Sequence, residues 1–260
     1  MRPNDSTIPK NHPRYQSLKT REKLVRLTEK KVVASAGLIA HGRGEAFDYL
    51  LGERTHESAL RAIETAAAAL LTSKHPVISV NGNTAALCPN EIIELASIVN
   101  AKIEVNLFHR SPERESAIKR LLEEHRAKEI LGVGPRASAK IPELCSERRR
   151  VDPDGIYQAD TVLIPLEDGD RAEALRRLGK TVIAIDLNPL SRTARAATIT
   201  IVDNVTRAMP RLISEAKRLK SQSREELADM VDGFDNRRNL RSSISSICEH
   251  LEAVAEGILK

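Results

Sequence analysis

Residues 161–192 read TVLIPLEDGDRAEALRRLGKTVIAIDLNPLSR, and this stretch decides the fold. It holds two short apolar runs, Thr161–Ile164 and Val182–Ile185, with a charged segment at Ala172–Leu178 between them. Aliphatic runs of this length are typical of strands buried on both faces, and a helix between two such runs indicates that the strands are parallel. The stretch therefore predicts strand, helix and strand, followed by a polar turn.

The same alternation continues on both sides of this unit. Four further aliphatic runs predict strands, at Val77–Val80, Ile103–Val105, Ile130–Val133 and Ile199–Val202. Helices are predicted between most of the strands, at Asn90–Val99 and Pro112–Arg126. Because crossovers between parallel strands are right-handed, we predict an α/β fold with a Rossmann-like, mostly parallel six-stranded sheet and helices on both faces.

Helical segments flank this sheet at both ends of the chain. Apolar periodicity predicts helices at Tyr15–Lys31 and His56–Lys74, and between them a glycine-containing loop, Gly37–Gly44, opens into a short helix at Glu45–Leu51.

After Asn204 the pattern is helical to Lys260, with a break at Gly233–Asn236. We expect one domain over 1–260, with N-terminal helices at 14–75, the Rossmann-like core at 76–204 and C-terminal helices at 205–260.

Composition excludes several classes of protein. No apolar run approaches the roughly 18 residues of a membrane span, and Met1–Lys10 lacks the apolar stretch of a signal peptide. Three isolated cysteines, Cys88, Cys145 and Cys248, make no disulfide framework and suit a cytoplasmic protein. The 41 Lys and Arg are interleaved with 36 Asp and Glu, and aromatic residues are only 2%. Since binding of single strands uses aromatic platforms, we expect no nucleic-acid partner, and small phosphorylated anions explain the excess of arginine.

The residues that follow the predicted strands are polar at almost every strand end. In an open parallel sheet, ligands bind beyond the carboxyl ends of the strands. Five of the six ends carry Asn, Asp or Arg and the sixth has two glycines, at Asn81-Gly82-Asn83, Asn106–Arg110, Gly132–Gly134, Glu167–Arg171, Asp186–Asn188 and Asp203-Asn204. Asn, Asp and Gly are also common turn residues, but the whole set along one edge indicates a site for a polar ligand.

Several of these residues suit phosphate chemistry. The backbone of Asn81-Gly82-Asn83 can approach a phosphate closely. Arg43, between Gly42 and Gly44, offers a bidentate cation, and Arg21 is a candidate for a second one. His109 and Arg110 follow a strand and are candidates for binding a phosphate or carrying a proton.

The acidic stretch Glu167-Asp168-Gly169-Asp170-Arg171 precedes a predicted helix. One acid could cap that helix, but three acids could also hold Mg²⁺ between phosphate oxygens or bind the ammonium group of an amine substrate. Asp168, Asp170 and Arg171 are therefore candidate site residues.

Signatures of other chemistries are missing from the sequence. It contains no P-loop, no Gly-x-Gly-x-x-Gly after a first strand and no Gly-x-Ser-x-Gly. The remaining interpretation is chemistry driven by positioning and charge neutralisation, as in phosphoryl or nucleotidyl transfer.

Four long strings resemble archaeal phosphopantothenate synthetase, the 4-phosphopantoate–β-alanine ligase family. They are Ala36–Leu50, Ser79–Asn83, Pro165–Arg171 and Ile185–Arg192, and the likeness runs from about His12 to beyond Arg207.

The resemblance implies a homodimeric enzyme of coenzyme A biosynthesis. It implies that ATP, with Mg²⁺, activates 4-phosphopantoate as an acyl adenylate, and that AMP and diphosphate are released. It implies that the residues that bind ATP are Arg21, Arg43, Asp186, Leu187, Asn188, Arg192, Thr193, Asp203 and Asn204. His109 lies where the family has a tyrosine, which leaves it without an implied role. A non-catalytic nucleotide sensor and a basic nucleic-acid-binding protein are the alternatives that remain.

Overall fold

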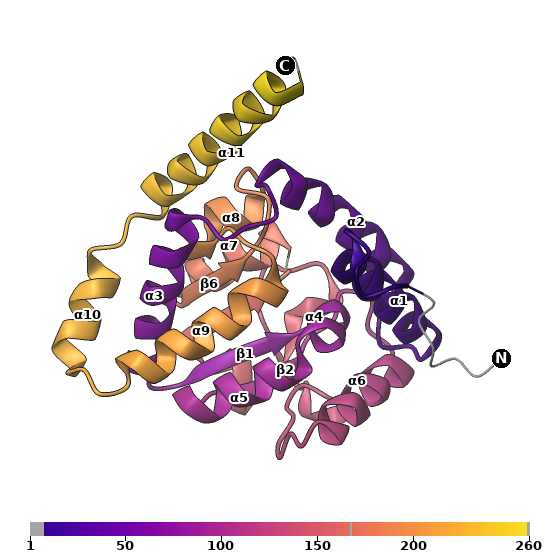
Figure 1. Cartoon of the computed structure of the whole chain (residues 1–260). Coiled ribbons are helices and arrows are strands. Elements are labelled where there is room, and N and C mark those ends of the chain that lie inside the picture. The colour runs from indigo at the N-terminus through magenta and orange to yellow at the C-terminus, as the bar shows by residue number, and fades with distance from the viewer. Residues whose placement is uncertain (1–7, 167, 259–260) are drawn as a thin grey trace.

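The aliphatic runs form one open sheet in which all strands are parallel (Figure 1). The structure, a computed structural model, describes residues 8–166 and 168–258. The strand order is β2-β1-β5-β6-β7. The strands are β1 (Pro76–Val80), β2 (Lys102–Val105), β5 (Thr161–Pro165), β6 (Thr181–Ile185) and β7 (Ile199–Ile201). The predicted α/β class is confirmed, and the sheet has five strands where six were predicted.

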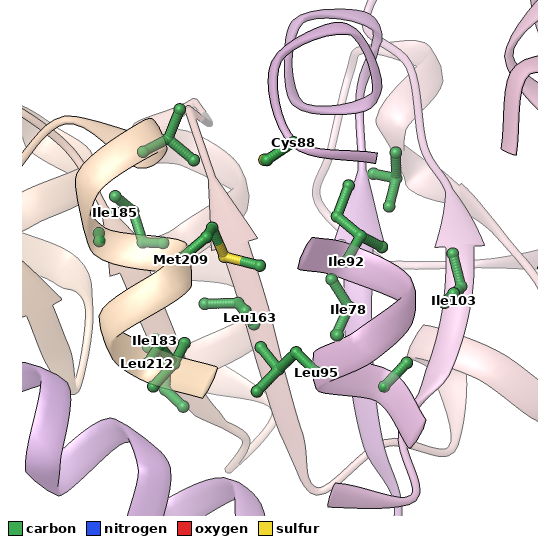
Figure 2. Packing of buried hydrophobic residues seen from close by; sticks show 14 of the residues in the cluster. Ile78, Cys88, Ile92, Leu95, Ile103, Leu163, Ile183, Ile185, Met209 and Leu212 are labelled. Atoms are coloured by element: carbon green, nitrogen blue, oxygen red, sulfur yellow. The ribbon is translucent and has the colours of Figure 1, made fainter. Parts of the chain in front are cut away.

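Two layers of helices cover the sheet because successive strand residues point to opposite faces. Ile78, Leu163 and Ile183 pack into the cluster that joins the sheet to α3, α5 and α9 (Figure 2). Their neighbours Val77 and Val162 pack on the other face, against α7 and the segment 139–159. These helices are α3 (Glu57–Thr72), α5 (Pro89–Val99), α7 (Gly169–Arg177) and α9 (Val205–Leu219).

The sixth predicted strand, Ile130–Val133, makes only one bridge to the sheet. Leu131 pairs with Glu104 of β2, donating to the Ile103 carbonyl and accepting from the Val105 amide. Gly132 then has a φ of +74° and Gly134 a φ of +60°. The left-handed conformation turns the chain away from the sheet after a single paired residue.

The predicted loop Gly37–Gly44 is wrong, because these residues belong to a helix, α2 (Ser35–Leu50). A β-carbon on Gly37 would clash with the Asn83 side chain, and one on Gly44 would lie 3.7 Å from Leu187. Glycine weakens an isolated helix by about 1 kcal/mol per residue, but here Gly37 lets the helix pack closely. Tertiary packing therefore overrides the local preference. The helix before it is α1 (Tyr15–Glu29).

The C-terminal region consists of three helices, with one break more than predicted. The predicted break near Gly233–Asn236 separates α10 (Arg224–Asp232) from α11 (Asn236–Ile258). A second break, at 220–223, ends α9. The reason is a capping box at Ser223 and Glu226, which satisfies the free amides at the start of α10.

The remaining helices, strands and turns connect the elements already named. They are α4 (Gly82–Leu87), α6 (Pro112–Glu124), α8 (Arg192–Ala196), an antiparallel pair β3 (Ala139–Lys140) and β4 (Arg150–Val151), and the turns Gly134–Arg136, Glu147–Arg149 and Pro153–Tyr157. No helix in the described parts of the chain is long and apolar enough to cross a membrane.

Candidate functional site

The carboxyl ends of the five strands share one edge of the sheet, which we call the rim. In parallel sheets this edge carries the ligand. We divide it by its residues. The turn half follows β6 and β7 and comprises Asp186–Thr193 with Asp203 and Asn204. The arginine half follows β2, β1 and β5 and comprises Arg110, Arg114, Arg148 and Arg171.

The turn half begins with a closed polar turn after β6. One carboxylate oxygen of Asp186 accepts from the Asn188 amide at 2.9 Å, and the other accepts from the Ser191 hydroxyl at 2.5 Å. The Asn188 side chain accepts from the Leu190 amide at 2.9 Å, and Ser191 caps α8 by accepting from the Ala194 amide. Each polar side chain thus holds the backbone of its neighbours, which fixes the turn without any ligand.

The carboxylate of Asp186 is partly desolvated. Burial raises its pKa above the usual range for aspartate, although the Ser191 hydroxyl, the Asn188 amide and the charge of Arg43 act in the opposite direction. Arg43 extends from α2, whose Gly44 packs on Leu187. The guanidinium of Arg43 is exposed and lies near enough to act on Asp186. The structure thus brings together two of the predicted nucleotide residues that are more than 140 positions apart in the sequence.

Arg21 lies on α1 and is held by an acid of α2. Its Nε and Nη2 donate to Oε2 of Glu45 at 3.1 and 2.8 Å. Glu45 also accepts from the hydroxyls of Ser17 and Tyr49, and these donors lower the pKa of its carboxyl against the effect of burial. Arg21, 42% exposed in its side chain, lines an open pocket of about 500 Å³ between α1 and α2. Glu45 therefore orients Arg21.

The first turns of α7 and α8 meet at the middle of the rim. A β-carbon on Gly169 would clash with Arg192, so only glycine lets the two helix starts approach. Arg192 is 60% exposed in its side chain and forms a two-pronged ion pair with Glu173 of α7, at 3.0 to 3.3 Å. Thr193 is buried next to it. Two helix N-termini therefore lie beside one exposed arginine.

Asp203 and Asn204, after β7, are engaged with the protein itself. Asp203 is buried, accepts from the hydroxyl of Thr55 at 2.7 Å and pairs with Arg207 at 2.7 Å. Asn204 caps α9 and donates to Asp48 of α2 at 2.8 Å, and Arg207 binds the same carboxylate. These contacts attach α2 to the sheet. The backbone of Asn204 is engaged as well, because its amide donates to Asp203 and its carbonyl accepts from the amides of Arg207 and Ala208.

The predicted substrate residues after β1 also have internal partners. Asn81 caps α4 and donates to the carbonyls of Pro165 and Leu166 at 3.0 Å. A β-carbon on Gly82 would clash with the Val32 carbonyl, and Asn83 donates to the Gly37 carbonyl at 2.8 Å. All three residues are buried. The contacts join the rim to the start of α2.

In the arginine half, the guanidinium of Arg110 is held by an ion pair and a hydrogen bond within the protein. Its Nη1 lies 2.7 Å from Glu115, and Nη2 donates to the Gly132 carbonyl at 3.2 Å. Both side chains of the pair are almost fully buried, at 3% and 6% exposure. Burial lowers the pKa of Arg110, and Glu115 opposes that shift.

Arg114 and Arg148 lie close together near the ends of β1 and β2. Arg148 pairs with Asp168 at 2.6 Å and donates to the Asn106 carbonyl at 3.3 Å. Arg114 donates to the carbonyls of Val32, at 3.1 Å, and His109. It forms no ion pair within the described residues, where its Nε also lacks an acceptor.

Electrostatics marks this pair as unusual. Burial lowers the pKa of Arg114, and the positive charge of Arg148 lowers it further. An anion between the two guanidinium groups would offset their repulsion and raise the pKa of Arg114 again. The surroundings of Arg114 and Arg148 are therefore those of an anion site.

The other predicted residues lie around this cluster. Arg171 is fully buried on α7 and donates to Ser79 at 3.0 Å. Asp170 is half-buried at the start of α7, and His109 is exposed with its ring edge-on to Phe108. Glu167 lies outside the described residues. Within the described ranges, no three acids, cysteines or histidines gather as a metal site.

Sequence reasoning missed Glu45, Arg207, Arg114 and the role of Arg148. Arg148 is 6% exposed while its neighbours Arg149 and Arg150 are half-buried, so the three consecutive arginines are not equivalent. A usable signal is the spacing of Arg110 and Arg114, because the first follows a strand and the second lies in the first turn of the next helix.

Comparison with known proteins identifies relatives over almost the whole chain. The family model described as phosphopantothenate/pantothenate synthetase matches residues 58–250. A protein of Thermococcus kodakarensis named 4-phosphopantoate–beta-alanine ligase is 55% identical over 250 residues, which are 96% of this chain and 95% of that protein. Proteins with the same name from Methanosarcina mazei and Methanospirillum hungatei are 53% and 51% identical, over 95% and 94% of this chain and 97% and 98% of their own lengths.

Proposed function

The chain belongs to the phosphopantothenate/pantothenate synthetase family, and from this premise we propose that it is the ligase that joins 4-phosphopantoate to β-alanine. The product is 4′-phosphopantothenate, a precursor of coenzyme A. A ligase of this kind uses ATP as a substrate. The resemblance in the sequence and the relatives agree on this activity.

The observation that carries the proposal for this chain is the division of the rim into two halves. Arg114 lacks a carboxylate partner within the described residues and lies beside Arg148, which suits a phosphate. The turn half offers acceptors and backbone amides, which suit a nucleoside. We assign 4-phosphopantoate to the arginine half and ATP to the turn half, with Arg192 and the start of α7 between them.

The reaction needs a carboxylate to become an electrophile. We propose that the carboxylate oxygen of 4-phosphopantoate attacks the α-phosphorus of ATP, which forms an acyl adenylate and releases diphosphate. The neutral amine of β-alanine then attacks the acyl carbon, which forms the amide and releases AMP. The proton of the amine passes to an acceptor that is not assigned to a residue.

For these two reaction steps, the residues of the site must bring two anions together. Two like charges about 4 Å apart repel by roughly 4 kcal/mol at an effective dielectric of 20. Arg43, Arg21 and Arg192 are the exposed or partly exposed cations that we assign to the phosphates of ATP, and Asp186 and Asn188 are assigned to the adenosine. Asp203 and Asn204 are assigned a positioning role beside the nucleotide, because both side chains have internal partners that attach α2 to the end of β7.

Mg²⁺ is expected to arrive with the ATP phosphates and to neutralise their charge. Asp170 is the acid of the 168–170 stretch that we assign to it, since Asp168 pairs with Arg148. The catalytic candidates His109 and Arg110 receive no catalytic role, because His109 is exposed and Arg110 is bound to Glu115. We also propose that the whole chain acts as one domain and that it is a homodimer.

The test is a pair of assays on the purified protein. AMP should form from ATP and Mg²⁺ only when 4-phosphopantoate and β-alanine are both present. Labelled diphosphate should exchange into ATP when 4-phosphopantoate is present and β-alanine is absent, because the first step is reversible. If no AMP forms, the proposed ligase activity is contradicted. If ADP forms in place of AMP, the proposed acyl-adenylate intermediate is contradicted. A nucleotide sensor would bind ATP without exchange, and a nucleic-acid binder would give a salt-dependent gel shift.

A further inference from the structure

The last two turns of α11 have no support from the rest of the described chain. Every residue from Leu251 to Ile258 is exposed, and the helix projects beyond the body of the molecule (Figure 1). Its first turns are anchored, because Asn236 and Asn239 bind the backbone of β7 at Thr200. Short helices without packing are marginal in water, so this helical end needs a surface to cover it.

The exposed end carries a regular apolar stripe. Its residues recur with a spacing of four, three, four and three, and all are exposed: Ile244, Cys248, Leu251, Ala255 and Ile258. Leu251 is 44% exposed and Ile258 is 78% exposed. A repeat of this spacing is the pattern by which one helix packs along another. The stripe therefore fits a helical partner.

The charges along α11 are separated by sign. Arg237, Arg238 and Arg241 occupy its first two turns, and Glu249, Glu252 and Glu256 occupy its last three. Two copies that cross antiparallel between Ser246 and Ile247 bring the basic end of each helix against the acidic end of the other. A parallel arrangement would bring like charges together. The charge pattern thus selects a second copy of the same helix, around a twofold axis.

The groove beside this stripe leads directly to the turn half of the rim. It has a volume of about 660 Å³ and is lined by Pro189 and Leu190 on one side and by α11, including Ile244 and Cys248, on the other. Leu190 lies in the middle of the Asp186–Arg192 turn and is 60% exposed. Leu187, three positions before Leu190, packs in one apolar cluster with Leu240 of α11.

We infer that α11 pairs antiparallel with α11 of a second copy, and that the partner's last turns cover Leu190 and complete the nucleotide turn of each subunit. The inference rests on the proposed assignment of ATP to that turn. In the dimer, Arg241 of each copy faces the partner's Glu252, and the partner's Leu251 packs along the groove toward Leu190. The dimer therefore holds the turn in the shape that binds the nucleotide.

A charge exchange tests the arrangement. Arg241 and Glu252 are 11 positions apart, about 16 Å along one helix, so they cannot pair within a chain. R241E and E252R should each raise the dissociation constant of the dimer at least tenfold in analytical ultracentrifugation, and the double variant should restore it. A double variant as weak as the single ones would overturn the antiparallel pairing.

Cross-linking provides a second, independent measurement. Cys248 lies near the twofold axis, Cys145 is the other exposed cysteine and Cys88 is buried. A short bismaleimide should join two copies in the C145S variant and fail to do so in C248S. Cross-linking through Cys145 alone, or none in the full chain, would contradict the interface.

The link to the nucleotide needs its own control. L251E should give a monomer that binds ATP at least tenfold more weakly than the wild type in calorimetry, while L178E, which adds the same charge at an exposed leucine directly after α7, should not. A monomeric L251E with wild-type ATP affinity would overturn the completion of the site. A wild type that binds no ATP at all would instead contradict the proposed function and leave the charge-exchange result standing.

Discussion

The two halves of the rim lie on the same sheet edge, but they differ in whether their cations are enclosed or exposed to solvent. The arginine half encloses its cations: Arg110 and Arg148 are paired with acids, and the half-buried Arg114 is held, within the described residues, by carbonyls. The turn half exposes Arg192, with the exposed Arg43 of α2 beside it, and holds a half-buried acid, Asp186, inside a closed hydrogen-bonded turn. A desolvated cation binds an anion strongly because no water competes for it. An exposed cation binds with less energy and releases more easily.

This difference suits the two substrates that we assign. The arginine half is prepared before its ligand arrives, which favours a small, doubly charged phosphate that must be held in one position. In our proposal the turn half recognises a larger molecule, ATP, through shape and backbone amides, and Arg43 and Arg192 lie exposed at its edge. The comparison teaches that one fold edge can supply both kinds of recognition, since strand order alone decides which loops meet.

The largest effect is expected from Arg114→Ala. It removes the cation that has no acid of its own within the described residues, so no buried carboxylate is left behind. Loss of one or two charge-assisted bonds, at roughly 1.5–3 kcal/mol each, should lower kcat/KM for 4-phosphopantoate about 100-fold. Steady-state kinetics with each substrate varied would measure this.

The KM for ATP should stay unchanged in this variant, and Arg120→Ala on the exposed face of the same helix should have wild-type kinetics. A rise in the KM for ATP alone would mean that Arg114 binds ATP, and it would contradict the assignment of 4-phosphopantoate to the arginine half.

Arg43→Ala tests the exposed cation of the turn half. Because the side chain is exposed, the melting temperature should remain that of the wild type, while the KM for ATP should rise about tenfold. Nucleotide calorimetry and thermal unfolding measure the two effects separately. Arg26→Ala, exposed on α1, is the matched control. Kinetics indistinguishable from the wild type would remove Arg43 from the site.

Asp186→Asn tests the turn itself. Asparagine retains one acceptor oxygen and loses the other, so either the Asn188 amide or the Ser191 hydroxyl loses its partner. We expect a rise of about five- to tenfold in the KM for ATP and a loss of roughly 1 kcal/mol in the free energy of unfolding. An effect on β-alanine alone would contradict the assignment of this turn to the nucleotide.

The smallest expected effect is a pH dependence that comes from Glu104. This residue is buried in β2, and burial raises its pKa to about 7, although the amides of Ile156 and Asp152 act in the opposite direction. The folded state then holds a proton that the unfolded state has lost, so the free energy of unfolding falls as the pH rises from about 4.5 to 7. One proton limits the slope to about 1.4 kcal/mol per pH unit.

Denaturant unfolding at several pH values measures that slope. Glu104→Gln should lower the stability at pH 5 and flatten the slope between pH 5 and 7, while activity assays at pH 7 report on the neighbouring arginine half. A slope that Glu104→Gln leaves unchanged would mean that another group titrates.

Much of the fold could be predicted because burial on both faces of a strand leaves a direct mark in the sequence. The runs at Val77–Val80 and Val182–Ile185 are aliphatic throughout and became strands. Ile130–Val133 carries the same mark, but Gly132 and Gly134 adopt left-handed conformations and only Leu131 pairs. The glycines of Gly37–Gly44 gave the opposite error, a predicted loop where the chain is helical. Gly37 and Gly44 allow close packing against Asn83 and Leu187 within that helix.

The site could be predicted in part for the same kind of reason. The Asp186–Arg192 turn follows a strand, so its position at the rim was fixed by local pattern. Arg114 and Arg148 were not found, because neither the burial of a guanidinium nor the absence of an acid beside it has any local signature.

The sequence by itself determined the class of fold, the edge of the sheet at which the candidate site residues lie and, through long matching strings, the family. These properties depend on local patterns: apolar period, turn residues and motif order. The tertiary structure alone decided which cations are desolvated and which polar residues have internal hydrogen-bond partners, as Asn81 and Asp203 do. It also decided which face of α11 is left uncovered by the described residues. The physical reason is that desolvation and charge pairing depend on distances between residues that are far apart in the chain.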